Sequence, residues 1–154
     1  MESTQQRLLK GLLAGLIAGL VATAAKTLVE RFYPPHTHGE PEPEELLAER
    51  IAGHHLDDGT KEIAGEAIQW GFGALTGAAY GALAEFYPAA TSKDGASFGM
   101  ALMTLTHEKA LPALGLASEP ADQTFREQSS EAASHVLYGV VAEKVRGWVR
   151  GALD

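Results

Sequence analysis

Cysteine is absent from this chain of 154 residues, and only 7% of the residues are aromatic. The absence of cysteine excludes a disulfide framework, a thiolate metal site and a thiol nucleophile. Strand signatures are missing too, because no run of alternating β-branched residues occurs and no Asn-Gly or Asp-Gly pair joins two such runs. The sequence therefore predicts an all-α protein, and its length fits one helical domain over residues 1–154.

A basic cluster is also lacking. The chain has 12 Lys and Arg against 20 Asp and Glu, a formal net charge of -8, so nucleic acid is not expected as a partner. No P-loop, dinucleotide-binding fingerprint or Ser-His-Asp pattern occurs, and we expect no cofactor. The first apolar run is too long for a cleaved signal peptide and lacks a convincing cleavage site.

What is present is a set of long apolar segments separated by proline. We expect a bundle of about four helices over residues about 4–32, 61–87, 95–111 and 127–152. Pro34 and Pro35 end the first helix, Pro88 ends the second, and Pro112 breaks or kinks the third.

The connection over residues 36–61 is polar and acidic. Within it, Pro43 followed by Glu44 and Glu45 is typical of a helix start, and Gly53 is typical of a helix end. We therefore expect one short amphipathic surface helix here, outside the bundle core.

Small residues recur every four positions in the first two long helices. The series are Gly11, Gly15 and Gly19, then Gly73, Gly77 and Gly81, with Ala14, Ala18 and Ala22 on an adjacent stripe. A glycine inside an exposed helix costs about 1 kcal/mol relative to alanine, so these positions need a compensating gain. Close helix packing supplies it, and the pattern is typical of membrane helices. Glycine packing in a soluble bundle is the alternative.

The apolar stretches only partly reach membrane-spanning length, which is about 20 residues. The uncharged stretch from Gly11 to Ala25 has 15 residues and qualifies if Lys10 and Lys26 reach the interfaces. The second stretch has 18 residues, and the third and fourth helices have only 12 and 11. Lysines and arginines divide evenly between the two sides, so they set no orientation.

A series of short motifs in order resembles the YagU family of bacterial inner-membrane proteins, the DUF1440 domain of unknown function. The series is Pro34-Pro35, Gln69-Trp70, Tyr80-Gly81, Ala84 to Pro88, His107, Pro112, Gly115-Leu116, Ser130-Glu131, His135, Tyr138-Gly139 and Glu143. His36 stands where the family commonly has arginine after its two prolines, and Gln69 stands where it often has histidine. The resemblance implies four membrane helices and supplies no reaction or substrate.

Ionisable groups inside these helices form the candidate site. An ionisable group in the middle of a bilayer is costly and usually faces the bundle interior or a watery cavity. The candidates for a polar interior are His107, Glu108, Glu131, His135, Tyr138 and Glu85. Glu131 and His135 are four residues apart and share a helix face, so we expect His135 to approach Glu131 and either His107 or Glu108. Glu66 and Glu143 are expected at the helix ends.

The leading hypothesis is a small multi-pass membrane protein in the lipid bilayer, a homo-oligomer serving ion or proton passage or a membrane stress response. One alternative is an enzyme with a metal or acid-base site on the last two helices. We expect no metal, because a di-iron bundle needs Glu-x-x-His pairs and this chain has Glu-x-x-x-His and His107-Glu108. The loop pairs His36 and His38, or His54 and His55, are expected to be solvated. A soluble helical interaction module is the other alternative.

Overall fold

The computed structural model describes residues 2–36 and 39–153, so His38 and its proposed pairing with His36 lie outside the described residues. Every regular element among the described residues is helical, which confirms the all-α prediction. The helices are α1 Thr4–Phe32, α2 Pro43–Ala52, α3 Asp58–Phe86, α4 Ala96–Leu105, α5 Leu111–Ala113 and α6 Phe125–Ala152. The shorter turns are η1 Pro88–Gly95, η2 Thr106–Ala110 and η3 Pro120–Asp122.

Three helix boundaries differ from the sequence prediction, each for a local reason. α3 begins three residues earlier because Asp57 caps it and accepts a hydrogen bond from the Thr60 N–H. α6 begins two residues earlier because Thr124 and Glu127 form a reciprocal capping box. Pro112 does not end the third helix, because a π-helical turn, η2, precedes it and carries the chain on into α5.

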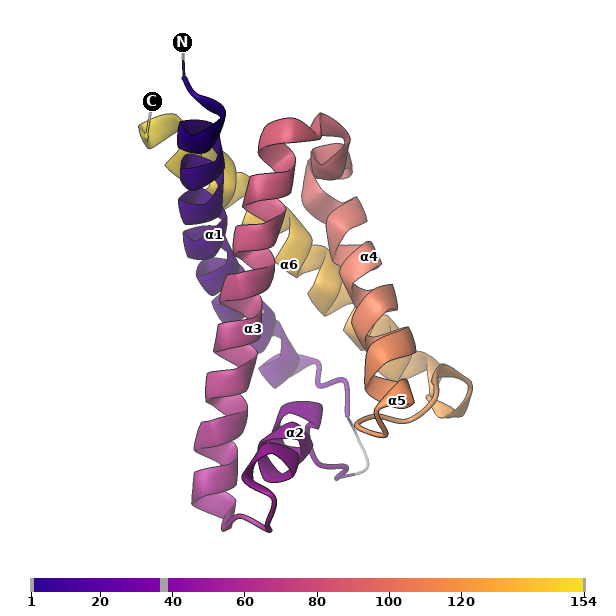
Figure 1. Cartoon of the computed structure of the whole chain (residues 1–154). Coiled ribbons are helices and arrows are strands. Elements are labelled where there is room, and N and C mark those ends of the chain that lie inside the picture. The colour runs from indigo at the N-terminus through magenta and orange to yellow at the C-terminus, as the bar shows by residue number, and fades with distance from the viewer. Residues whose placement is uncertain (1, 37–38, 154) are drawn as a thin grey trace.

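α1 and α3 run antiparallel and touch through their glycines (Figure 1). A Cβ atom added to Gly15 would lie 2.8 Å from the Gly81 Cα and would overlap the Gly77 carbonyl group. Gly11 meets Gly81 in the same way, and Gly19 meets Gly73. The backbones of the two helices are therefore in direct contact over several turns, an arrangement that only glycine permits. We call this contact the glycine seam.

α6 crosses behind α1 and α3 and buries small and polar residues (Figure 1). Ala22 of α1 packs against Tyr138 and Ala142 of α6, and all three are buried. Near the other end of α1, Ser130 of α6 donates a hydrogen bond to the Tyr33 carbonyl oxygen. The alanine stripe of α1 thus faces α6, beside the glycine face that meets α3.

α4 meets α6 through a second set of glycines that the sequence analysis did not single out. A Cβ atom on Gly99 would overlap the carbonyl group of His135, and Gly95 contacts Gly139 in the same way. Gly95 also has a φ of 87°, which ends the η1 turn and starts α4. This close crossing holds α4 against the part of α6 that carries His135.

α2 packs against α3 at the end of the molecule farthest from the termini (Figure 1). Pro43 and Ala48 are buried, and the Glu45 backbone lies over Gly65. The sequence placed residues 36–61 outside the bundle core, and that expectation is wrong for α2. Pro43 and Ala48 are buried because α2 lies at the end of the molecule where α3 and α4 diverge (Figure 1).

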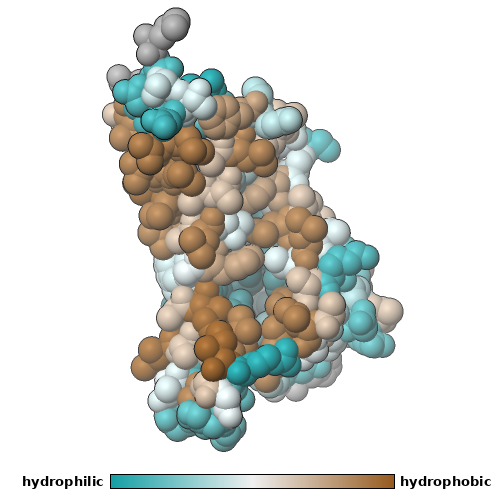
Figure 2. Space-filling model, viewed as in Figure 1, coloured by the Kyte–Doolittle hydropathy of each residue, from teal (hydrophilic) through white to brown (hydrophobic). Residues whose placement is uncertain are grey.

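The outer surface of the bundle is unusually apolar. Exposed large side chains run along α1 and α3, with Leu9 and Leu13 of α1 more than half exposed and Leu75 of α3 71% exposed. Figure 2 shows this as a brown band over α1 and α3, with teal at both ends of the molecule. Among the described residues, α1 alone has the length and hydropathy to cross a membrane, and only 33% of its most apolar window is buried.

Candidate functional site

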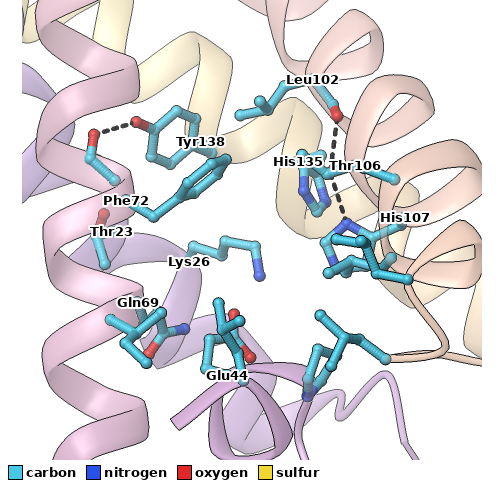
Figure 3. Close-up of a pocket in the computed structure, with 18 residues that line it drawn as sticks. Thr23, Lys26, Glu44, Gln69, Phe72, Leu102, Thr106, His107, His135 and Tyr138 are labelled. Carbon is cyan, nitrogen blue, oxygen red and sulfur yellow. Dashed lines mark hydrogen bonds between the residues drawn. The ribbon is translucent and has the colours of Figure 1, made fainter. Parts of the chain in front are cut away.

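A cavity of about 240 Å³ opens between α3 and α4, with α2 as its floor (Figures 2 and 3). Its walls are mostly apolar, and a few polar groups from different helices converge on it. Lys26 comes from α1, Glu44 from α2, Gln69 from α3, His107 from η2 and His135 from α6. Such a cavity, apolar with a few polar groups, is the usual form of a small-ligand site.

His107, Glu131 and His135 form a compact cluster at the side of this cavity. One Glu131 carboxylate oxygen, Oε2, lies 3.5 Å from His107 Nε2 and 3.4 Å from His135 Nδ1. The two imidazole rings meet edge to face, with centroids 4.7 Å apart. Glu131 and His135 are both buried. The structure therefore brings together three of the predicted residues from α6 and η2, which we call the His/Glu cluster.

The local fold explains why His107 faces α6. Thr106 donates a hydrogen bond from its hydroxyl to the Leu102 carbonyl, and the Leu111 N–H reaches the Thr106 carbonyl in the wide π turn. The π turn accommodates Pro112, which lacks an N–H and would crowd the carbonyl four residues earlier in a regular α-helix. A π turn also changes the direction of the side chains that follow, and such turns are common at functional sites.

The His/Glu cluster lies between two cavities. His107 lines both of them, His135 lines the larger one, and Glu131 lines a smaller cavity of about 70 Å³ on the other side. His36 also lines the smaller cavity, and its Nδ1 lies 3.2 Å from a Glu42 carboxylate oxygen. This contact with Glu42 raises the pKa of His36. The cluster is thus accessible from two directions.

Lys26 and Glu44 are site residues that the sequence analysis missed. Figure 3 shows the Lys26 ammonium pointing into the larger cavity, and it pairs with Glu30 on its own helix. The sequence analysis expected Lys26 to reach the membrane interface, and the Lys-x-x-x-Glu spacing of Lys26 and Glu30 was the available signal for a paired, inward lysine. Burial of Glu44 against the cavity raises the pKa of its carboxyl.

Tyr138, another predicted residue, lines the cavity and ties α6 to α3. Its hydroxyl donates a 2.7 Å hydrogen bond to the Gly73 carbonyl oxygen (Figure 3). Gly73 belongs to the glycine seam, so this bond links the seam to the helix that carries Glu131 and His135. The role of Tyr138 in the structure is therefore to position α6 relative to α3.

Two predicted interior residues lie away from the cluster. Glu85 is at the opposite end of the bundle, where its carboxylate binds Arg150 at 2.7 Å and lies 3.8 Å from Arg7. Glu108 is half-exposed and makes no hydrogen bond or ion pair with the residues that the structure describes. It follows His107 in the π turn, and its side chain does not share the direction of its neighbour.

Residues expected at helix ends or in loops fall into two groups. Glu66 is exposed and accepts a hydrogen bond from the Trp70 indole. Glu143, in contrast, lies inside the bundle, where it accepts a 2.7 Å hydrogen bond from the Tyr80 hydroxyl and pairs with Arg146. His54 and His55 are exposed, and His55 pairs with Glu49.

Fold and site together define an all-helical bundle packed through glycine, with a buried His/Glu cluster between two cavities. The family model of DUF1440, described as a protein of unknown function, matches residues 20–144. The chain belongs to the DUF1440 family. No curated protein matches the chain, and no solved structure does.

Proposed function

We propose that the protein is a small integral membrane protein whose bundle lets a small cation, a proton or a metal ion, pass by way of the His/Glu cluster. The bacterial inner membrane, the kinship with YagU-type members of the family and a homo-oligomeric assembly belong to this proposal. It does not include a reaction on a substrate.

The main support for the proposal is that small and polar residues lie inside the bundle, whereas large apolar residues lie on its surface. The buried interior consists largely of glycine, alanine and polar side chains, including Ser130, Glu131, Ser134 and His135. The exposed surface of α1 carries leucine, isoleucine and valine along most of its length. Water-soluble proteins bury their large apolar side chains and leave Glu and His exposed unless these are paired. The reversed arrangement suits a surface that faces lipid.

The dimensions of α1 agree with this interpretation. An apolar window of 18 residues in an α-helix is about 27 Å long, close to the roughly 30 Å of a bilayer core. Charged residues mark both ends of the apolar band, with Arg7, Lys10 and Arg150 at the end near the termini and the exposed Arg31 at the other. The His/Glu cluster would then lie near the polar edge of the band.

Cation passage is supported by the position of the cluster between the two cavities. A cation in the smaller cavity meets Glu131 and His107, and a cation in the larger cavity meets His107 and His135. The two imidazoles can exchange a proton or bind a metal. Intramembrane Glu and His residues are typical of ion pathways and proton relays.

The test has a membrane arm and a passage arm. We expect the overexpressed chain to sediment with membranes in ultracentrifugation and to need detergent for release; recovery in the detergent-free supernatant would contradict the membrane claim.

Proteoliposomes with an entrapped pH-sensitive or metal-sensitive dye measure passage. Wild type should respond to an imposed gradient, and Glu131→Gln should respond at least tenfold more slowly. Glu108→Gln is the matched control, because this neighbouring carboxylate lies outside the cluster. Equal rates for wild type and Glu131→Gln would reject the pathway.

A further inference from the structure

The proton positions at the His/Glu cluster can be assigned from its hydrogen bonds. Thr106 has one hydroxyl proton, and it donates this proton to the Leu102 carbonyl at 2.8 Å. The 2.9 Å contact between Thr106 Oγ1 and His107 Nδ1 therefore has the imidazole as donor. With Nδ1 carrying the hydrogen, the neutral ring has a bare lone pair on Nε2, and this atom faces Glu131.

His135 is fixed in the same tautomer. Its Nδ1 lies 2.9 Å from the main-chain carbonyl oxygen of Glu131, which can only accept a hydrogen bond. Nδ1 is nearer to this carbonyl than to the Glu131 carboxylate, at 3.4 Å, so the hydrogen bond goes to the main chain. The lone pair of the neutral ring is then on Nε2. A hydrogen bond of this kind orients histidine ligands in metal sites.

In the neutral cluster, His107 Nε2, His135 Nε2 and the Glu131 carboxylate are all hydrogen-bond acceptors, and no donor in the described part of the chain is directed at Glu131 Oε2. Glu131 Oε2 is buried and has no hydrogen-bond partner among the described residues, and the Glu131 side chain is only 6% exposed. A buried carboxylate oxygen in this condition is costly unless a cation or a donor satisfies it. His107 Nε2, 3.5 Å away, cannot donate in its neutral form. The arrangement therefore lacks one positive charge at its centre.

We propose that His107, Glu131 and His135 bind one divalent transition-metal ion of the Zn²⁺ type. One ligand atom from each residue lies within 4.8 Å of the others. Four-coordinate zinc with bond lengths of about 2.0–2.1 Å places its ligands roughly 3.4 Å apart. The distance of 3.5 Å from His107 Nε2 to Glu131 Oε2 already fits this value, and His135 would bind through Nε2, because its Nδ1–H is held by the Glu131 carbonyl oxygen.

Ligand type and charge favour this class of ion. Two imidazoles and one carboxylate suit zinc, iron, copper or nickel, whereas magnesium and calcium prefer oxygen ligands alone. The nearest positive side chain in the larger cavity, Lys26, is paired with Glu30, and Glu44 adds a second carboxylate to the cavity wall. The cavities on both sides of the cluster leave room for water as a further ligand.

The spacing of Glu and His within single helices does not predict this site. The ligand set combines an i, i+4 pair on α6 with a histidine from the π turn of the neighbouring helix, which no single-helix spacing describes. This inference goes beyond the proposed function: the metal site can exist whether or not the bundle passes ions, and the following experiment measures binding only.

Zinc binding by the purified full-length chain in detergent tests the proposal. After EDTA treatment and its removal, titration calorimetry and elemental analysis should give one Zn²⁺ per chain. Glu131→Gln, which keeps the side-chain volume, should weaken zinc binding at least 100-fold. Glu108→Gln and the double variant His54→Ala/His55→Ala should bind as wild type does, because these residues are remote from the cluster. Binding by wild type below about a tenth of an equivalent, or unchanged in Glu131→Gln, would overturn the proposal.

The visible spectrum of Co²⁺ bound to the wild-type chain tests the site even if the Glu131→Gln variant fails to fold. Co²⁺ bound to wild type should give the visible absorption bands of a four- or five-coordinate site, and excess Zn²⁺ should remove them. A spectrum of octahedral, fully hydrated Co²⁺ would overturn the assignment even if Glu131→Gln proved unstable. Neither result bears on membrane insertion or dye response, so failure of this proposal is distinguishable from failure of the proposed function.

Discussion

The α1–α3 pair and the α4–α6 pair both pack through glycines, but the glycine contacts extend over different lengths of the two pairs. Both are held together by glycines whose backbones touch. Along α1 and α3 the contact continues through Gly11, Gly15 and Gly19, whereas along α4 the glycine contacts stop at Gly99. Beyond Gly99 the second pair is filled by imidazoles and a carboxylate. Glycine contacts bring two helices so close that no functional side chain fits between them. The His/Glu cluster forms where these contacts stop.

The glycine seam should be the most sensitive part of the molecule. Gly15→Ala forces a Cβ into the carbonyl group of Gly77, so we expect it to lower the free energy of unfolding by about 3 kcal/mol, the upper end for overpacking. Gly71→Ala on α3 is the matched control, because a Cβ there meets nothing within 4 Å. Thermal unfolding in detergent measures both. Equal midpoints for the two variants would mean that the seam is not a tight contact.

The α4–α6 crossing should lose less stability than the glycine seam, because α4 has only ten residues and can shift more easily than the 29-residue helices α1 and α3. Zinc binding should weaken as well. Gly99→Ala presses on the carbonyl of His135, so we expect a cost of about 1–2 kcal/mol and weaker zinc binding, because α4 moves away from α6. Gly147→Ala, with open space around its Cβ, is the control on α6. Calorimetry of zinc binding in both variants makes the comparison. Zinc binding in Gly99→Ala as tight as in wild type would separate the crossing from the site.

Tyr138 joins the two pairs and should contribute one hydrogen bond. Tyr138→Phe removes the bond to the Gly73 carbonyl and should cost about 1 kcal/mol of unfolding free energy. Tyr87→Phe is the control, since Tyr87 is 66% exposed. Thermal midpoints of the two variants and wild type give the result. No difference between Tyr138→Phe and Tyr87→Phe would show that the bond does not connect the helices.

The smallest effect should come from the cap of α3. The Thr60 hydroxyl and N–H hydrogen-bond the Asp57 carboxylate and lower its pKa. A lowered folded-state pKa gives stability above the unfolded pKa, about 3.9, and this stability is lost as pH falls through the folded value. We expect Asp57→Ala to have a slightly lower thermal midpoint than wild type at pH 7, and this difference should shrink as pH falls below about 3.9. Asp58→Ala, at a fully exposed side chain, serves as control. A difference that is the same at pH 7 and at pH 2 would exclude this linkage.

Much of the fold could be predicted from local patterns. The bounds of α1 were predicted because Pro34 and Pro35 end an apolar run, and those of α2 because Pro43 and Gly53 mark a start and an end. The starts of α3 and α6 were late by a few residues, although the Thr124-x-x-Glu127 capping box was visible in the sequence. Local hydrogen-bonding rules therefore account for these elements.

The site depended on contacts between helices, which the sequence shows only in part. The pairing of Glu131 with His135 followed from their spacing, and the approach of His107 followed from the need of buried polar groups for partners. The sequence did not reveal that the π turn would turn Glu108 away or that Lys26 would enter the cavity. The Glu85 side chain is only 7% exposed, but its helix position could not reveal its partner Arg150, 65 residues further along the chain.

Site-directed spin labelling measures whether the outer face of α1 lies in lipid. Since the chain has no cysteine, a single spin label can be attached at Leu13→Cys, where the native side chain is 53% exposed, and at Asp58→Cys as the water-facing reference. In bilayers, the label at position 13 should collide more often with oxygen than with a water-soluble nickel complex. The label at position 58 should show the reverse. A nickel-complex collision rate at position 13 as high as at position 58 would contradict a lipid-facing α1.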